Sequence, residues 1–91
     1  MSPDIATVQT FLAVIDCGSV IEASRVRGYS AAAVSRQLGR LQGRLGVRLF
    51  VREGRSIRPT EAAIALALHD RRLVAEAEKF ERYSQHLERA N

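Results

Sequence analysis

The sequence is short of several residue types, and each shortage excludes a class of protein. It has one cysteine, so it can form neither an internal disulfide nor a thiolate metal site. We expect this residue, Cys17, to be a small buried side chain, with a redox-sensing thiol as the alternative. No apolar run approaches the roughly 18 residues that a membrane span needs, and Asp4 stands where a signal peptide would be basic. A cytoplasmic protein without a membrane segment is therefore expected.

The residue groupings needed for catalysis or metal binding are also scarce. The two histidines, His69 and His86, are far apart and have no carboxylates or cysteine near them at metal-ligand spacing. No glycine-rich phosphate loop follows a predicted strand, and no serine, histidine and acid can be grouped into a triad. With 91 residues the chain holds one small domain. We therefore expect no enzyme, no metal site and no cofactor.

Positive charge, in contrast, is abundant and concentrated. The formal net charge is +4, but residues 25–58 carry nine arginines against Glu53 as the single acid, whereas the segments on either side are net acidic. Arginine has a planar guanidinium that suits phosphates and guanine edges, and a clustered basic face is typical of nucleic-acid binders. The alternative is a solvated surface with an incidental excess of arginine.

Apolar spacing and capping residues predict two helices at the start of the chain. The first is expected over residues 4–16, where apolar residues recur at helical spacing. Ser19 followed by Glu22 forms a capping box, in which each side chain satisfies a free backbone amide of the other residue. This box predicts a second, short helix over residues 20–27, which Gly28 would close in a left-handed conformation.

A third helix is expected over residues 30–45, with Ser30 as its cap. One face is a narrow apolar stripe that should pack in the core, formed by Val34, Leu38, Leu41 and Leu45. The opposite face combines arginines with very small residues, namely Ala32, Ser35, Arg36, Gly39, Arg40 and Gly43. Small residues would let the helix backbone lie close to a surface that the arginines hold. The simpler explanation is that a well-packed helix tolerates its two glycines.

After this helix the sequence predicts a short hairpin. Two strands, over residues 50–52 and 56–58, are joined by a glycine-containing turn. Arginines occupy both strands and the turn, at Arg52, Arg55 and Arg58. The hairpin therefore resembles a basic wing.

One long helix is predicted over residues 60–90, because no proline or glycine interrupts it after the capping residue Thr60. An apolar stripe repeats every seven residues along it, at Leu66, Leu73, Phe80 and Leu87, with Ala77 beside it. Ile64 and Leu68 point to another side, so the first half of the helix is apolar on two faces. This pattern favours a helix that leaves its domain and pairs with the same helix of a second copy.

Several short strings, distributed over residues 4–90, together resemble one known family. They are Phe11-Leu12-Ala13-Val14, Gly18-Ser19, Ala33-Val34-Ser35-Arg36-Gln37-Leu38, Leu41, Leu45-Gly46-Val47-Arg48-Leu49-Phe50, Arg52, Gly54-Arg55 and Thr60-Glu61-Ala62. The sequence is similar to the N-terminal DNA-binding domain of LysR-type bacterial transcriptional regulators. The resemblance implies a winged helix-turn-helix whose third helix enters the major groove, with Arg36 contacting a base edge and Ser35 a base or phosphate. It also implies that the long helix is a linker helix that dimerises two copies.

The sequence departs from the family pattern in three ways. Ala31 and Ala32 follow Ser30 where the family usually has glutamine and proline, so a base-contacting amide is missing. Arg27 stands where leucine is usual, so either the turn packs differently or this arginine adds a phosphate contact. The chain also lacks the effector-binding domain that normally follows, as would an excised fragment or a naturally short protein.

The predicted protein is mainly α, with a winged helix-turn-helix (three helices plus a two-stranded wing) over residues 1–58 and a long dimerisation helix over residues 59–91. We expect it to bind specific double-stranded DNA sequences as a homodimeric transcriptional regulator, with the wing on the minor groove or the backbone. The candidate DNA-binding residues are Ser30, Ala31, Ala32, Ser35, Arg36, Arg40, Arg52, Arg55 and Arg27. The candidate dimerisation residues are Leu66, Leu73, Ala77, Phe80 and Leu87. The alternative is a protein-interaction module whose working surface is the long helix.

Overall fold

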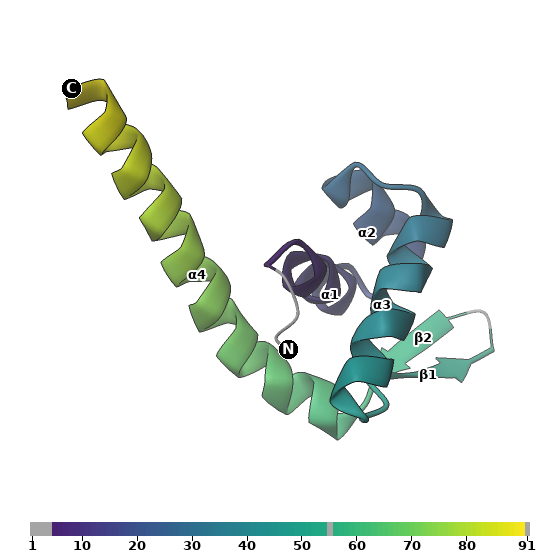
Figure 1. Cartoon of the computed structure of the whole chain (residues 1–91). Helices are drawn as coiled ribbons and strands as arrows, with labels where there is room; N and C mark the ends of the chain where they lie inside the picture. Colours follow the sequence, from purple (N-terminus) through teal and green to yellow (C-terminus); the bar gives the residue numbers. More distant parts are fainter. Residues whose placement is uncertain (1–4, 55, 91) are drawn as a thin grey trace.

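The structure is a computed structural model that describes residues 5–54 and 56–90. Its elements are, in chain order, α1 (Ile5–Cys17), α2 (Val20–Arg27), α3 (Ala31–Leu45), β1 (Phe50–Glu53), β2 (Ser56–Pro59) and α4 (Glu61–Ala90). The first three helices and the antiparallel β1–β2 hairpin form one body, and α4 runs past α1 and away from it (Figure 1). The predicted mainly α, winged helix-turn-helix architecture is confirmed.

The predicted capping residues define the helix-turn-helix. The Ser19 side chain accepts a hydrogen bond from the Glu22 backbone N–H at 3.2 Å, and Gly28 ends α2 at φ 73°. The Ser30 side chain accepts a hydrogen bond from the Ala33 N–H at 3.1 Å and so starts α3. A φ near 70° is readily available only to glycine, and it lets the chain reverse between α2 and α3 within three residues.

The core lies between α1, α3 and the start of α4. Phe11 and Leu49 are fully buried, and the ring of Phe11 meets that of Phe50 edge-on, with 5.9 Å between the ring centroids. The buried apolar residues are Val8, Phe11, Leu12, Val14, Ala23, Val34, Leu38, Leu41, Leu49, Ala63, Ala67 and Val74. This set draws on every helix, so α1 to α3 and the base of the wing are fixed relative to one another.

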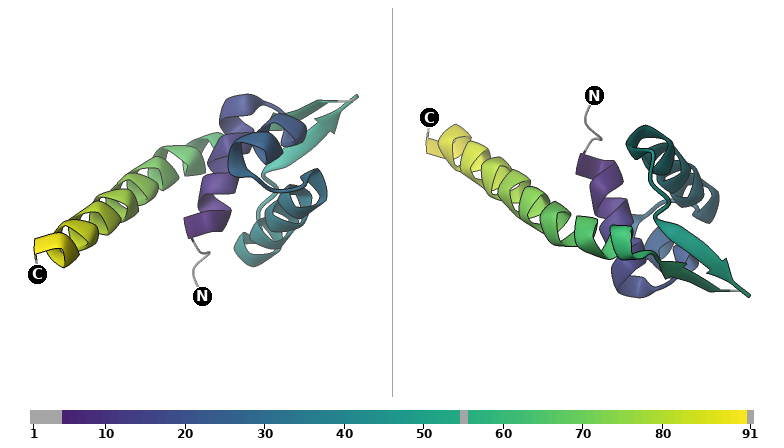
Figure 2. Two further views of the ribbon diagram at one scale, coloured as in Figure 1. Left: turned by 90° about the horizontal axis from the view of Figure 1, so that it is seen from above. Right: turned by 90° about the horizontal axis from the view of Figure 1, so that it is seen from below.

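The side of α4 that packs on the domain lies between the two apolar faces predicted from the sequence, one with Leu66 and Leu73 and the other with Ile64 and Leu68. Ala63, Ala67 and Val74 are buried against the core, whereas Ile64 and Leu68 are more than half exposed. Small side chains allow α4 to approach α1 closely. Beyond Val74 the helix projects away from the body, which gives the molecule extents of 54 × 24 × 20 Å (Figure 2).

Two predictions of burial were wrong. Cys17 is exposed, because at 100° per residue it lies on the side of α1 opposite Val8 and the core. Leu45 is 37% exposed although it continues the apolar stripe of α3. It stands in the last turn of α3, directly before the exposed Gly46 and Val47, where the helix has passed beyond its neighbours.

Candidate nucleic-acid interface

One face of α3 is buried and the opposite face is open to solvent. Val34, Leu38 and Leu41 are buried in the core. The predicted contact residues on the other face are all exposed, namely Ser30, Ala31, Ala32, Ser35, Arg36 and Arg40. The first three turns of α3 therefore present small side chains and arginines to an approaching surface.

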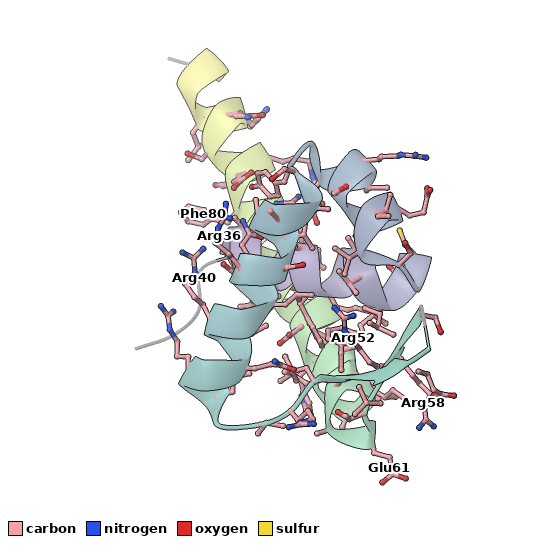
Figure 3. The ribbon with its side chains drawn as sticks, turned by 90° about the vertical axis from the view of Figure 1, so that its right-hand side faces the viewer. Arg36, Arg40, Arg52, Arg58, Glu61 and Phe80 are labelled. Atoms are coloured by element: carbon pink, nitrogen blue, oxygen red, sulfur yellow. The ribbon has the colours of Figure 1, made fainter. Side chains whose placement is uncertain are left out.

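Several exposed arginines of the basic segment make no ion pair within residues 5–54 and 56–90. They include Arg36 and Arg40 on α3, Arg48 just before the wing, and Arg52 on β1. In the view onto α3, Arg36 and Arg40 extend from one side of the helix, and Arg52 lies on the other side, towards the wing (Figure 3). Arg55 lies outside the described residues. The helix and the wing thus offer separate cationic groups on either side of α3.

Other arginines of the basic segment are neutralised locally. Arg25 pairs with Glu22 at 3.0 Å, and Arg58 pairs with Glu53 across the hairpin. Both pairs are largely exposed, so each is worth little in stability. The arginines outside these two pairs include Arg36, Arg40, Arg48 and Arg52, whose charges are not balanced by an ion pair in the part of the chain that the structure describes.

A cleft of about 300 Å³ lies between the start of α2, α3 and the wing. Three hydroxyl groups line it, from Ser19, Ser35 and Ser56, together with the guanidinium-bearing Arg52. The Ser56 hydroxyl already donates to the Glu53 carbonyl, which leaves the Ser19 and Ser35 hydroxyls and the Arg52 guanidinium as groups that can donate hydrogen bonds to anionic oxygens. The cleft therefore has the chemistry of a surface that follows a phosphate backbone.

Arg27 turns out to be engaged inside the domain. Its Nε donates to Thr10 Oγ1 at 3.2 Å, and its guanidinium lies 5.3 Å from the centre of the Tyr29 ring. A further long hydrogen bond reaches the Ala6 carbonyl at 3.4 Å. The arginine thus ties α2 and the turn to α1.

The candidate dimerisation residues on α4 differ in exposure. Leu66 is partly buried against its own domain and Ala77 is half-buried. The side chains of Leu73, Phe80 and Leu87 are 48%, 75% and 50% exposed, so their own domain leaves much of their apolar surface uncovered. The second half of α4 therefore carries an apolar surface that its own domain does not cover.

Two residues with a place in these surfaces were missed from the sequence. Tyr83 is 56% exposed and lies one turn after Phe80, so the helical spacing from Phe80 could have identified it. Gln42 connects α3 to the wing through its side chain. No sequence signal identified Gln42, because its partners are backbone groups.

Two aspartates near the base of α4 have shifted pKa values. Hydrogen bonds from the Arg71 guanidinium lower the pKa of the Asp16 carboxyl, and the same contact raises the pKa of Arg71. Burial raises the pKa of Asp70, against a smaller opposing attraction from His69. These groups lie at the α1–α4 contact and not on the arginine face.

Neither a metal centre nor a membrane segment emerges from residues 5–54 and 56–90. No three histidine, cysteine, aspartate or glutamate side chains gather there into a group that could hold a metal ion. No helix in that part of the chain has the length and apolar content to cross a membrane.

The capped helix-turn-helix, the basic wing and the arginine face together define a winged helix-turn-helix domain of the regulatory type. The family model described as "Bacterial regulatory helix-turn-helix protein, lysR family" matches residues 5–64. The chain belongs to this LysR family, and the family predicted from the sequence is thereby confirmed.

Relatives and solved structures agree with this assignment. An uncharacterised HTH-type transcriptional regulator of Azotobacter vinelandii is 43% identical over 63 residues, which are 69% of this chain and 44% of the relative. An HTH-type transcriptional regulator of Xanthomonas campestris pv. campestris is 36% identical over 81 residues, 89% of this chain and 24% of the relative. The chain thus spans less than half the length of these relatives. Both names describe regulators and not enzymes.

Solved structures of two other proteins have the same fold. The complex of CbnR_DBD with DNA matches with a TM-score of 0.83 and 27% identity, covering 92% of this chain and 97% of that one. Oxidised-form and mutant OxyR structures of Corynebacterium glutamicum also match, one of the mutants with a TM-score of 0.89 and 26% identity over 93% of this chain and 26% of that one. These matches favour a DNA-binding regulator over the protein-interaction module.

Proposed function

We propose that this chain binds specific double-stranded DNA sequences as a homodimer and regulates transcription in the bacterial cytoplasm. The observation that carries the proposal is that Arg36 and Arg40 on α3 and Arg52 on the wing are exposed and make no ion pair within the described residues (Figure 3). An unpaired arginine loses no intramolecular partner when it binds a phosphate or a base. The DNA complex of CbnR_DBD, which shares this fold, supports it further.

In this proposal α3 lies in the major groove. Ser30, Ala31 and Ala32 start the helix with small side chains, so its backbone can come close to the DNA. Arg36 contacts a guanine edge, the commonest specific contact of arginine, and Ser35 contacts a base or a phosphate. Without an amide at the start of α3 to read adenine, DNA shape supplies the remaining specificity.

The wing and the flanking arginines hold the backbone. Arg40 lies one turn after Arg36 and is proposed to contact a phosphate, while Arg52 and Arg55 reach the neighbouring minor groove or its phosphates. Arg27 is the least available of the candidates, since its guanidinium is already bound to Thr10. Residues 1–58 are thus the proposed DNA-binding unit.

The proposed dimer forms through residues 59–91, the segment that contains α4. Leu73, Phe80 and Leu87 would be covered by the α4 of the second copy, together with Ala77 and the exposed part of Leu66. Two copies then present two α3 helices, so that the DNA target has two half-sites.

Selection of bound sequences from a random DNA pool tests this function. We expect a two-part consensus, and mobility-shift titration on it should resist competition by scrambled DNA. With Arg40, Arg52 and Arg55 of each protomer at phosphates, a dimer neutralises about six phosphates, so log affinity should fall with log salt at a slope of roughly −5. No enriched sequence, or a slope shallower than about −3, would contradict the arginine interface.

A further inference from the structure

The side chain of Gln42 connects the end of α3 to the start of the wing. Its Oε1 accepts hydrogen bonds from the backbone N–H of Leu49 at 2.8 Å and from that of Phe50 at 3.2 Å. Its own backbone carbonyl accepts hydrogen bonds from the N–H groups of Gly46 at 2.9 Å and Val47 at 3.4 Å. A single residue of α3 therefore accepts four backbone N–H groups of the segment that leads into β1.

The other end of this segment is held by the start of α4. The Thr60 hydroxyl donates a hydrogen bond to the Arg48 carbonyl at 2.8 Å, and the Thr60 N–H donates to the Leu49 carbonyl at 2.9 Å. Leu49 is fully buried. The base of the hairpin is thus anchored on one side to α4 and on the other side to α3, and the anchor on α3 is the Gln42 amide.

The position of Arg52 depends on this anchor. Phe50, whose N–H donates to Gln42, begins β1 two residues before Arg52. A second, shallow cleft lies on the side of α3 that faces the wing. Arg52 lines it together with Ser35, Gly39 and Gln42. A change in the contact between Gln42 and Phe50 would therefore move the wing arginine relative to α3.

We propose that Gln42 is a positioning residue that fixes the wing against α3, so that Arg52 and the α3 residues engage one half-site together. This rests on the proposed DNA-binding function and assigns Gln42 no contact with DNA. Its amide oxygen is the required group, because removing an acceptor leaves two part-buried N–H groups unsatisfied. If the angle between the wing and α3 is already fixed in the free protein, binding does not incur the entropy cost of ordering a mobile wing.

The test is a double-mutant cycle measured as affinity for the selected DNA sequence. Gln42→Leu removes the acceptor, and we expect it to weaken binding about tenfold, because both ordering and geometry of the wing are lost. In an Arg52→Ala background the same change should cost less than about threefold, because the wing contact is already absent. In an Arg36→Ala background the full penalty should remain. Equal penalties in all three backgrounds would overturn the proposal.

A matched control is present on the same helix. Gln37 is also a half-buried glutamine of α3, and its Oε1 has no hydrogen-bond partner within the described residues. Gln37→Leu should therefore leave binding within about twofold of the unmodified protein. Gln42→Glu keeps an acceptor oxygen in place and should restore most of the affinity lost in Gln42→Leu. Failure of Gln42→Glu to bind better than Gln42→Leu would overturn the role of the acceptor.

Hydrogen exchange of the protein without DNA separates this inference from the proposed function. The Leu49 and Phe50 amides should exchange at least about tenfold faster in Gln42→Leu than in Gln37→Leu. If Gln42→Leu is too unstable for the measurement, Gln42→Asn replaces it, since its amide is one methylene too short to reach both N–H groups. Unchanged exchange at both amides would overturn the anchor, even if the protein binds DNA. Faster exchange in a protein that selects no DNA would support the anchor and refute only the proposed function.

Discussion

The carboxylate of Asp16, near the end of α1, accepts hydrogen bonds from both terminal nitrogens of Arg71 in α4. Nη2 meets Oδ1 at 2.5 Å and Nη1 meets Oδ2 at 3.3 Å. This two-point contact between distant parts of the chain fixes the direction of α4 as well as its distance from α1. The pair stands just where α4 leaves the body, so it helps to set where the proposed dimerisation surface lies relative to α3.

Breaking this pair should cost little stability, and the cost should depend on pH. Both side chains are about half exposed, so we expect Asp16→Asn to lower the free energy of unfolding by about 0.5 kcal/mol at pH 7. Because the pKa of Asp16 is lowered on folding, its contribution is present above the unfolded value of about 3.9 and is lost as pH falls through the folded value. Urea unfolding of Asp16→Asn and of the unmodified protein, at pH 7 and at about pH 2.5, measures both the loss of stability and its dependence on pH.

Glu22→Gln is the control for that experiment, because it breaks a pair within one helix, Glu22–Arg25, and touches no tertiary contact. It should cost about 0.3 kcal/mol or less. An Asp16→Asn difference that persists unchanged at the acidic pH would show that the side-chain charge is not its cause.

Removing the charge of Asp70 should stabilise the protein, whereas removing that of Asp16 should destabilise it. Burial raises the pKa of this carboxyl, so its ionised form opposes folding at pH 7 and folding becomes more favourable as pH falls towards the unfolded pKa. We expect Asp70→Asn to raise Tm by about 2 °C at pH 7, corresponding to a few tenths of a kcal/mol. The gain should disappear at about pH 3, where Asp70 is protonated. Glu78→Gln, an exposed charge on the same helix, should leave Tm unchanged, and a loss of Tm in Asp70→Asn would refute the desolvation argument.

The local signals of the sequence located the secondary structure closely. Ser19, Ser30 and Gly28 act through backbone groups within a few residues of themselves, so they specify helix ends whatever surrounds them. The predicted hairpin strands were each one residue too short, since pairing continues to Glu53 and to Pro59. Hydrogen-bond pairing between strands extends into residues that have no strand signal of their own.

Tertiary contacts were harder to predict. The contact of α4 with α1 uses Ala63 and Ala67, whose small size gives a weak hydrophobic signal beside the larger Ile64 and Leu68. Close packing favoured the small residues, and the large ones stayed exposed. The role of Gln42 was invisible for a similar reason, because its partners lie seven and eight residues further on and are backbone groups.

The exposed apolar surface of α4 predicts which substitutions should dissociate the proposed dimer. Leu73 and Phe80 are 48% and 75% exposed in a single chain. Changing both to alanine should remove apolar contact area worth several kcal/mol across two chains, so sedimentation should show a monomer. The circular dichroism spectrum should remain helical, because neither residue belongs to the buried core.

The control for dimerisation is a variant that loses two exposed apolar side chains on another helix. Ile21 and Val26, on α2, are 59% and 70% exposed. Their double alanine variant should stay dimeric at the same protein concentration. A Leu73→Ala/Phe80→Ala protein that remains a tight dimer would place the interface away from this surface.

Arg36 and Arg40 allow base reading to be separated from backbone binding within one helix. Both are exposed, unpaired and on the same side of α3, one turn apart, but Arg36 lies in the second turn, the part of a recognition helix that enters the groove. If Arg36 makes a bidentate contact with guanine, Arg36→Ala should cost about 1 to 3 kcal/mol per half-site on the selected sequence and relax preference at one base position. Arg40→Ala should weaken binding to selected and scrambled duplexes by similar factors and reduce the salt slope by about one per protomer. Titrating both variants on both duplexes distinguishes the roles: equal losses on the two DNAs for Arg36→Ala would mean that Arg36 also holds only phosphate, and the reading of guanine would then have to come from another residue.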